Sequence, residues 1–233
     1  MLNDLFVRAV VLVPSIIPHL GGGFYKTYDY MLGVIERLVR GVYNGNVGGD
    51  FVDALGNLLT GQITQAFRQA YEDEGFTDMF PPEYLQIALD AMLTQHINFD
   101  WIYQYYKDII DARVDETSIQ PLLARAALWA NRYNEAYNAA ILAIQSANGG
   151  KLVWEIGATE KHCPACRDLN GIVAYASEWE LAGCKPQNAP NPALTGDRDG
   201  EKGCEGWQCD CNLTPTTKRR SPKAFDKIMK ARL

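Results

Sequence analysis

The sequence predicts a mainly α-helical protein, in which a helical N-terminal domain is followed by a small, loop-rich α+β module. Two observations predict this class. Apolar residues recur at helical spacing from residue 24 to about residue 147, and all six cysteines fall between Cys163 and Cys211. A chain of 233 residues with 47% hydrophobic residues can bury a proper core. The expected divisions are an N-terminal arm (1–23), a helical domain (24–150), a cysteine-rich module (151–213) and a basic C-terminal tail (214–233).

The N-terminal arm contains an apolar stretch from Val7 to Leu20. Pro14 and Pro18 interrupt it, and it is shorter than the roughly 20 residues that a membrane span needs. It also lacks the pattern of a signal peptide, because no small-x-small cleavage site precedes the glycines at 21–23. We expect the arm to pack against the body or a partner protein, and the chain to reside in a reducing compartment, which disfavours disulfides.

Two amphipathic helices are predicted first. One ends at the Asn-Gly-Asn of residues 44–46, and the other begins near Asp50 as N-cap and ends at Gly75. Both should share a core, because each carries apolar residues on one helical face. These residues are Met31, Leu32, Ile35, Leu38 and Val39 in the first helix and Phe51, Leu55, Leu58, Leu59, Ile63, Phe67 and Tyr71 in the second.

Further helices follow. Pro81 and Pro82 open the third, and the aromatic run 99–110 either continues it or starts a fourth. The longest predicted helix runs from about residue 119 to the Asn-Gly-Gly of residues 148–150. Its aromatic residues at i, i+4 and i+8 form one stripe, which we interpret as core or subunit packing: Trp129, Tyr133 and Tyr137.

The character of the chain changes at Lys151. Residues 151–156 predict a short strand, Asn170-Gly171 predicts a β-hairpin turn, and residues 182–206 are rich in Gly, Pro, Asn and Asp. This module is expected to hold too few apolar residues for a core of its own. Such a module needs a covalent or metal staple.

The cysteines are the candidate staple. Cys163 and Cys166 form a C-x-x-C pair, and Cys209 and Cys211 lie at i and i+2, so both face one side of an extended strand. Cys204 competes for either position of the second pair. Cys184 stands apart from both clusters and is the weakest candidate for a ligand. The spacing predicts a structural Zn²⁺ site, although 37 residues separate the two clusters. Disulfides and reactive thiols are the alternatives.

An enzymatic role is not expected. Four or five cysteines saturate a tetrahedral ion, whereas a catalytic zinc keeps one position open. No phosphate-binding loop, nucleophile elbow or paired-carboxylate pattern is found in the sequence. A metal-dependent hydrolase is the competing interpretation, and it would depend on Glu160, His162 and Glu178. His19 and His96 are interpreted as ordinary structural side chains.

The C-terminal segment is basic. Residues 212–233 carry seven Lys and Arg against Asp226, a net charge of +6, so the rest of the chain carries −12. This tail is either a solvated arm or a binding site for a phosphate backbone or an acidic protein surface. The candidate residues are Lys218, Arg219, Arg220 and Lys223.

Several stretches resemble one protein family. The sequence WEIGATEKHCPACRDLNG (154–171), then YASEW, a G-x-x-P-Q turn and CEGWQCDCNL (204–213) are similar to the C-terminal signature of phage minor head proteins, the Mu-like head morphogenesis family. The stretches VRGVYNG, GDFVDAL and ARAALWANRYNEAYN resemble the helical body of those proteins. The resemblance covers about residues 30–215.

The resemblance implies a structural role in the virion. A few copies would associate with the portal vertex, contact portal, capsid and scaffold proteins in the host cytoplasm, and enter the head with the packaged DNA or be ejected with it. In many relatives the last cluster reads His-Pro-x-Cys-x-Cys, and here Cys204 replaces that histidine at a different offset, which leaves the fourth ligand open. The alternative from another class is a zinc-ribbon-like nucleic-acid-binding protein.

Overall fold

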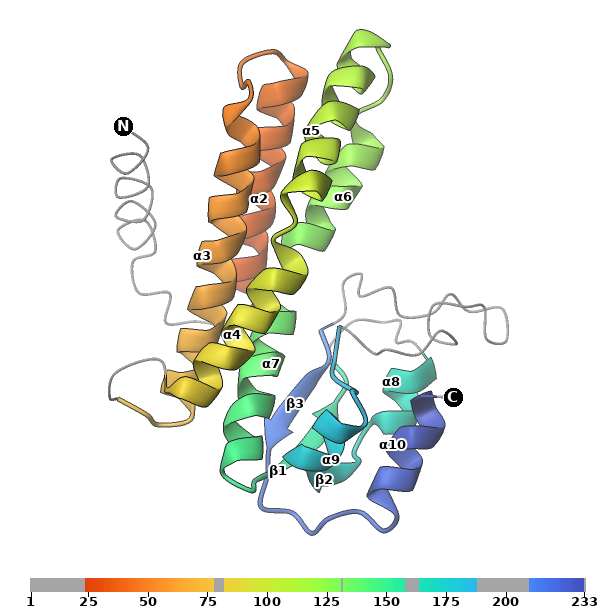
Figure 1. Ribbon diagram of the computed structural model, residues 1–233. Coiled ribbons are helices and arrows are strands. Elements are labelled where there is room, and N and C mark those ends of the chain that lie inside the picture. The colour runs from red at the N-terminus through yellow and green to blue at the C-terminus, as the bar shows by residue number, and fades with distance from the viewer. Residues whose placement is uncertain (1–23, 78–81, 131, 158–163, 188–209, 233) are drawn as a thin grey trace. The chain divides into compact units, whose positions relative to one another are not determined.

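The protein is mainly α-helical and contains one small antiparallel sheet (Figure 1). The computed structural model describes residues 24–77, 82–130, 132–157, 164–187 and 210–232. The elements are, in order, α2 (Phe24–Tyr43), α3 (Asp50–Asp73), α4 (Glu83–His96), α5 (Phe99–Val114), α6 (Gln120–Ala130), α7 (Arg132–Ala147), β1 (Lys151–Glu155), α8 (Pro164–Leu169), β2 (Val173–Tyr175), α9 (Ala176–Leu181), β3 (Asn212–Pro215) and α10 (Ala224–Arg232). The predicted class, a helical body with a small α+β part, is confirmed at this level.

The chain folds into two compact units whose limits differ from the expected boundary at residue 150. The first unit contains the described residues up to Thr64 together with Leu93–Tyr133. The second contains Gln65–Met92 and the described residues from Asn134 onward. The limits fall inside α3, α4 and α7, because the apolar period of a helix does not report where along its length its neighbours change.

The first unit is built around α2, which packs against α5 and α6. The buried residues of α2 and α3 include most of those predicted from helical spacing, whereas Leu32, Leu38 and Leu58 are only partly buried. Tyr105 of α5 lies in this core and donates its hydroxyl to the carbonyl of Leu122 at 2.6 Å. The cluster consists of Met31, Ile35, Val39, Val42, Phe51, Leu55, Leu59, Ile102, Tyr105, Ile109, Leu122, Leu123, Ala126 and Ala130.

Helix ends follow the sequence signals in most places. Gly45 and Gly75, which follow α2 and α3, adopt positive φ angles of 78° and 83°. The aromatic run starts a helix of its own, because the Asn98 side chain caps α5 by accepting from the N–H groups of Asp100 and Trp101. Helices α6 and α7 occupy the span of the predicted long helix, and residue 131 between them lies outside the described residues.

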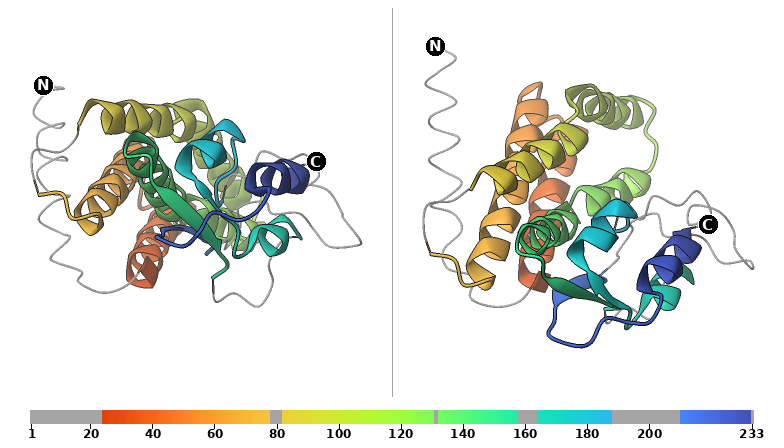
Figure 2. Two further views of the ribbon diagram at one scale, coloured as in Figure 1. Left: turned by 90° about the horizontal axis from the view of Figure 1, so that it is seen from below. Right: turned by 60° about the horizontal axis from the view of Figure 1, so that its bottom comes forward.

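The second unit contains the sheet, ordered β2-β1-β3 and antiparallel throughout. The strand predicted at 151–156 is β1. The hairpin predicted at Asn170-Gly171 is wrong, because the turn there, with Gly171 at φ 77°, connects helix α8 to β2 and not two strands. Helix α10 packs against α8, α9 and β2, as Figure 2 shows for its neighbour α8.

The cysteine-bearing module has more apolar packing than its sequence suggests. Trp154 of β1 and Trp179 of α9 are fully buried, with ring centroids 5.6 Å apart, and the Trp179 indole donates to the carbonyl of Leu152 at 3.4 Å. The expectation that this module lacks a core is therefore wrong. The basic segment 214–233 also contributes, because Ala224, Ile228 and Ala231 of α10 are buried.

Candidate functional site

Three of the five predicted zinc ligands, Cys163, Cys204 and Cys209, lie outside the described residues. The described ones are buried: Cys166 in α8 is 3% exposed and Cys211, directly before β3, is 1% exposed. Cys184, after α9, is also 3% exposed. Among described residues, no group of three or more His, Cys, Asp and Glu side chains is arranged to hold a metal ion.

The sheet nevertheless brings the residues just after β1 and the residues just before β3 together at one end. In the β1–β3 register, Glu155 pairs with Asn212, so the chain leaving β1 runs antiparallel to the chain entering β3. Just beyond this pair, the Asp210 carboxylate lies against the backbone of Gly157, where an added Cβ would be 2.0 Å from Asp210 Cγ. The residues directly before 158–163 and directly after 188–209 are therefore neighbours.

The return of the chain after α8 reaches the same end of β1. Asn170 Oδ1 accepts from the backbone N–H of Ile156 at 3.3 Å, and the N–H of Gly171 donates to the carbonyl of Trp154 at 2.8 Å. The N–H of Asn170 donates to the carbonyl of Cys166 at 3.0 Å. The turn after α8 thus holds the helix that contains Cys166 against the end of β1 where Glu155 pairs with Asn212.

A buried cluster of side-chain amides holds the chain on the β3 side, at residues 211–213. Asn138 of α7 is fully buried, and its amide group donates to Gln187 Oε1 at 3.0 Å and to the Cys211 carbonyl at 3.3 Å. Its Oδ1 accepts from the N–H of Leu213 at 2.8 Å, and Gln187 Nε2 donates to the same Cys211 carbonyl at 2.8 Å. Residues 187 and 211, which lie on either side of the stretch 188–209, are thereby hydrogen-bonded to one helix. Sequence reasoning missed Asn138, although an Asn at a core position of a helix is an available signal.

Glu178, named in the hydrolase interpretation, takes part in an ion pair. Arg220 Nε donates to its Oε2 at 2.8 Å and Arg220 Nη2 bonds to its Oε1, so the contact has two points. The Arg220 hydrogen bonds lower the pKa of Glu178, aided by the backbone N–H of Tyr175. A general acid needs the opposite shift, so this geometry suits a structural role for Glu178. Glu160 and His162 lie outside the described residues.

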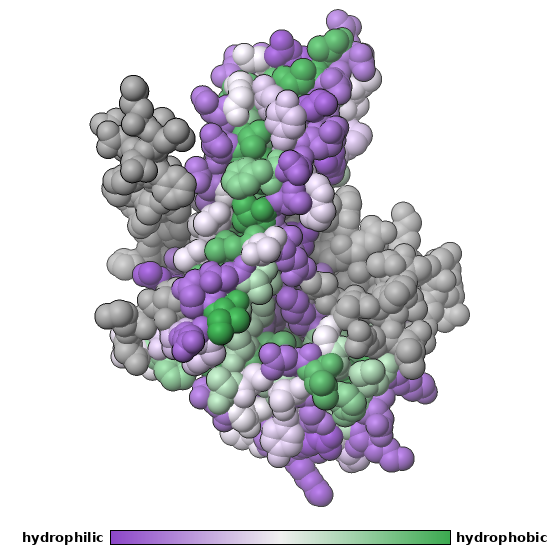
Figure 3. Space-filling model, viewed as in Figure 1, coloured by the Kyte–Doolittle hydropathy of each residue, from purple (hydrophilic) through white to green (hydrophobic). Residues whose placement is uncertain are grey.

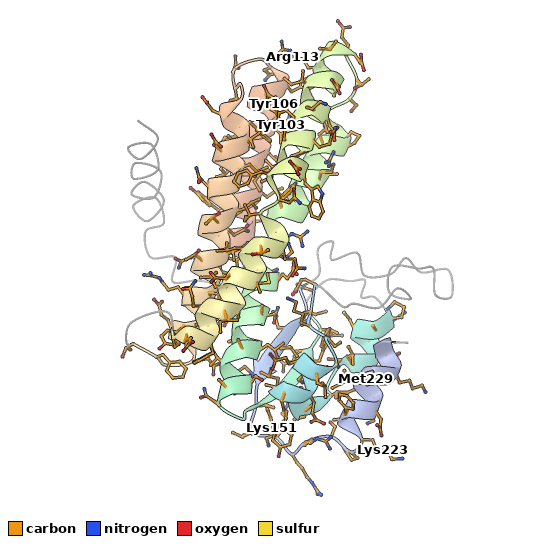
Figure 4. All side chains as sticks on the ribbon, in the orientation of Figure 1. Tyr103, Tyr106, Arg113, Lys151, Lys223 and Met229 are labelled. Carbon is orange, nitrogen blue, oxygen red and sulfur yellow. The ribbon has the colours of Figure 1, made fainter. Side chains whose placement is uncertain are left out.

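The basic candidate residues differ in their surroundings. Lys218, Arg219 and Lys223 are exposed, whereas Arg220 is engaged by Glu178. Lys151 donates to the carbonyls of Thr217 and Lys218 at 3.3 and 2.5 Å, which holds the segment before α10 against the sheet (Figure 4). These three cations lie in the segment between β3 and α10, and Lys227 and Lys230 of α10 are also exposed.

The aromatic residues divide between core and surface. Of the predicted stripe, Tyr133 is buried, Trp129 packs partly buried against the first unit's core, and Tyr137 donates to Asp73 Oδ2 at 2.7 Å. This packing agrees with the interpretation of the stripe as core. The α5 run keeps three large side chains on the surface, namely Phe99, Trp101 and Tyr103 at 55%, 61% and 55% exposure.

Comparisons of the chain with protein-family models, with curated proteins and with solved structures found no match. Within the described ranges, no helix is both long and apolar enough to cross a membrane.

Proposed function

We propose that this protein is a non-enzymatic assembly component of a phage head, a minor head protein that associates with the portal vertex. The observation that carries the proposal is the resemblance of residues 154–171 and 204–213 to the signature of that family. The exposed aromatic residues of α5 support a binding role, since Trp and Tyr are enriched in protein interfaces.

We further propose one structural Zn²⁺ in the second unit, with ligands drawn from Cys163, Cys166, Cys204, Cys209 and Cys211. The β1–β3 pairing supports a shared centre, because it makes Gly157 and Asp210 neighbours within a few residues of Cys163 and Cys209. The ion would supply no chemistry beyond holding these stretches together, since four thiolates leave no open position.

The assembly proposal is tested by co-purification with the portal of the same virus. The tagged full-length chain is expected to retain that portal through size-exclusion chromatography, and the portal of an unrelated phage serves as the control. Failure to retain the cognate portal at low and physiological salt would count decisively against the proposal.

A nucleic-acid-binding role is the second candidate, favoured by the exposed cations on and before α10. If Lys218, Arg219, Lys223, Lys227 and Lys230 contact phosphates, duplex affinity falls steeply with salt, with a slope of about 0.9 per phosphate neutralised. A Lys218→Gln/Lys223→Gln variant would then lower that slope by nearly two. A salt-independent affinity, or an unchanged slope, would exclude this candidate.

A further inference from the structure

A pocket of about 220 Å³ opens in the first unit, lined by three polar side chains and two indoles: His96, Trp101, Arg125, Trp129 and Arg132. These residues come from the end of α4, the start of α5, α6 and the first residue of α7. The volume is below the range of about 300–1,000 Å³ typical of sites for whole small molecules. It suits a group the size of one side chain.

The polar lining consists of hydrogen-bond donors of the kind that recognise anions. Arg125 is held in place: its Nη1 donates to Asp108 Oδ2 at 2.5 Å, and its guanidinium lies 4.6 Å from the Tyr105 ring centroid. A guanidinium has five N–H donors, so this pair leaves others for a ligand, and a second guanidinium and an imidazole line the same space. A planar carboxylate matches this donor set.

The two indole rings of the lining favour a ligand that carries apolar groups beside its anion. Trp101 is 61% exposed and its ring borders the pocket, while Trp129 stacks on the buried Tyr105 with centroids 6.4 Å apart. Figure 3 shows pale and green side chains following α5, bordered by hydrophilic residues. Exposed Trp and Arg together are typical of binding hot spots, which bury apolar groups around a polar anchor.

The charges around the pocket discriminate between a single anion and a polyanion. Two carboxylates adjoin the lining: exposed Asp100 directly precedes Trp101 in α5, and Asp108 accepts from Arg125. A nucleic acid would bring a row of phosphates past these carboxylates, whereas one carboxylate side chain brings a single negative charge to two guanidinium groups.

We infer that this pocket is a docking site for a single Glu or Asp side chain of a protein partner, with apolar residues beside that carboxylate packing on Trp101 and Trp129. The inference does not depend on the proposed phage role, because it rests on the pocket's own donors and rings. It names a contact by which a partner protein would be recognised.

The test uses the full-length chain labelled with ¹⁵N in its tryptophan indoles. The probes are N-acetyl-Phe-Glu-Phe amide and its isostere N-acetyl-Phe-Gln-Phe amide, with a twelve-residue oligothymidylate as the nucleic-acid arm. The Glu peptide is expected to shift the Trp101 and Trp129 signals, leave the Trp179 signal unmoved, and bind about tenfold tighter than the Gln peptide, since charge-assisted bonds are about twice as strong as neutral ones.

Variants distinguish binding in the pocket from nonspecific binding to exposed aromatic side chains. Trp101→Ala is expected to weaken Glu-peptide binding about fivefold or more, whereas Tyr103→Ala, a similarly exposed aromatic residue on the same helix, changes it less than about twofold. Arg132→Gln is expected to abolish the preference for Glu over Gln. Tyr103 lies outside the pocket lining and next to Tyr106, with ring centroids 6.4 Å apart (Figure 4).

Three results would overturn the inference. They are equal binding of the two peptides, absence of indole shifts with either peptide at millimolar concentration, and tighter binding of oligothymidylate than of the Glu peptide at the same indoles. The last result would assign the pocket to nucleic acid instead.

Discussion

The carboxylate of Asp210 lies so close to the backbone of Gly157 that a Cβ at residue 157 would come within 2.0 Å of Asp210 Cγ and 2.2 Å of both carboxylate oxygens. The contact continues the antiparallel pairing of β1 with β3, two strands from distant parts of the chain. Only glycine fits residue 157 without moving Asp210.

Gly157→Ala is therefore expected to destabilise the protein by about 1 kcal/mol or more, because the carboxylate must be displaced. Urea denaturation measures the change in the free energy of unfolding. The matched control is Gly48→Ala, since a Cβ at residue 48 meets no atom within 4 Å. In the double variant Gly157→Ala/Asp210→Ala much of the loss should be recovered, because the clashing group is gone. Equal tolerance of alanine at residues 157 and 48 would refute the close contact.

Removal of the Asn138 side chain is expected to destabilise the second unit. Asn138→Ala leaves the N–H of Leu213 without its side-chain acceptor and removes a donor from the Cys211 carbonyl. An unsatisfied buried polar group costs about 1–3 kcal/mol, to which the cavity adds. The exposed Asn148, just after the same helix, provides the control Asn148→Ala. Hydrogen exchange at the Leu213 amide should accelerate in the first variant only, and unchanged protection would contradict the amide cluster.

The sequence predicted much of the helical architecture because the signals there are local. Periodic apolar positions identified the buried faces of α2 and α3, and glycines marked where both helices end. The burial of α10 was missed because Ala224, Ile228 and Ala231 are few and small among many basic residues.

The candidate site was less predictable, because its geometry depends on contacts between distant segments. Composition and spacing identified the cysteines, but the proximity of Gly157 to Asp210 follows from strand register. Likewise, nothing local in the sequence shows that Asn138 meets Gln187 and Cys211. The Trp154–Trp179 core also depends on the sheet, since the two rings meet only when α9 packs on it.

The Glu178–Arg220 pair predicts a specific dependence of stability on pH. Arg220 lowers the folded-state pKa of Glu178 below its ordinary value of 4.5, so the pair contributes its full stability at pH values well above 4.5. That contribution is lost as the pH falls through the lowered folded-state pKa. Glu178→Gln should therefore have a lower Tm than the wild type at pH 7, and the difference should shrink toward pH 3. The control is Glu72→Gln at an exposed residue of α3. A Tm difference that is constant across this range would contradict the ion pair.

The proposed zinc site is tested by substituting two of its ligands one at a time, with Cys184, a third buried cysteine, as the control. Cys166→Ser and Cys211→Ser are each expected to lose the single zinc, whereas Cys184→Ser, at an equally buried residue outside the proposed ligand set, should keep it. Native mass spectrometry gives the metal content of each variant.

Structural zinc contributes on the order of 10 kcal/mol in domains that have little other core. Here Trp154 and Trp179 form a core of their own, so chelation should leave their near-ultraviolet circular dichroism partly intact. Wild-type protein without zinc, or equal zinc loss in all three variants, would refute the proposed ligand set.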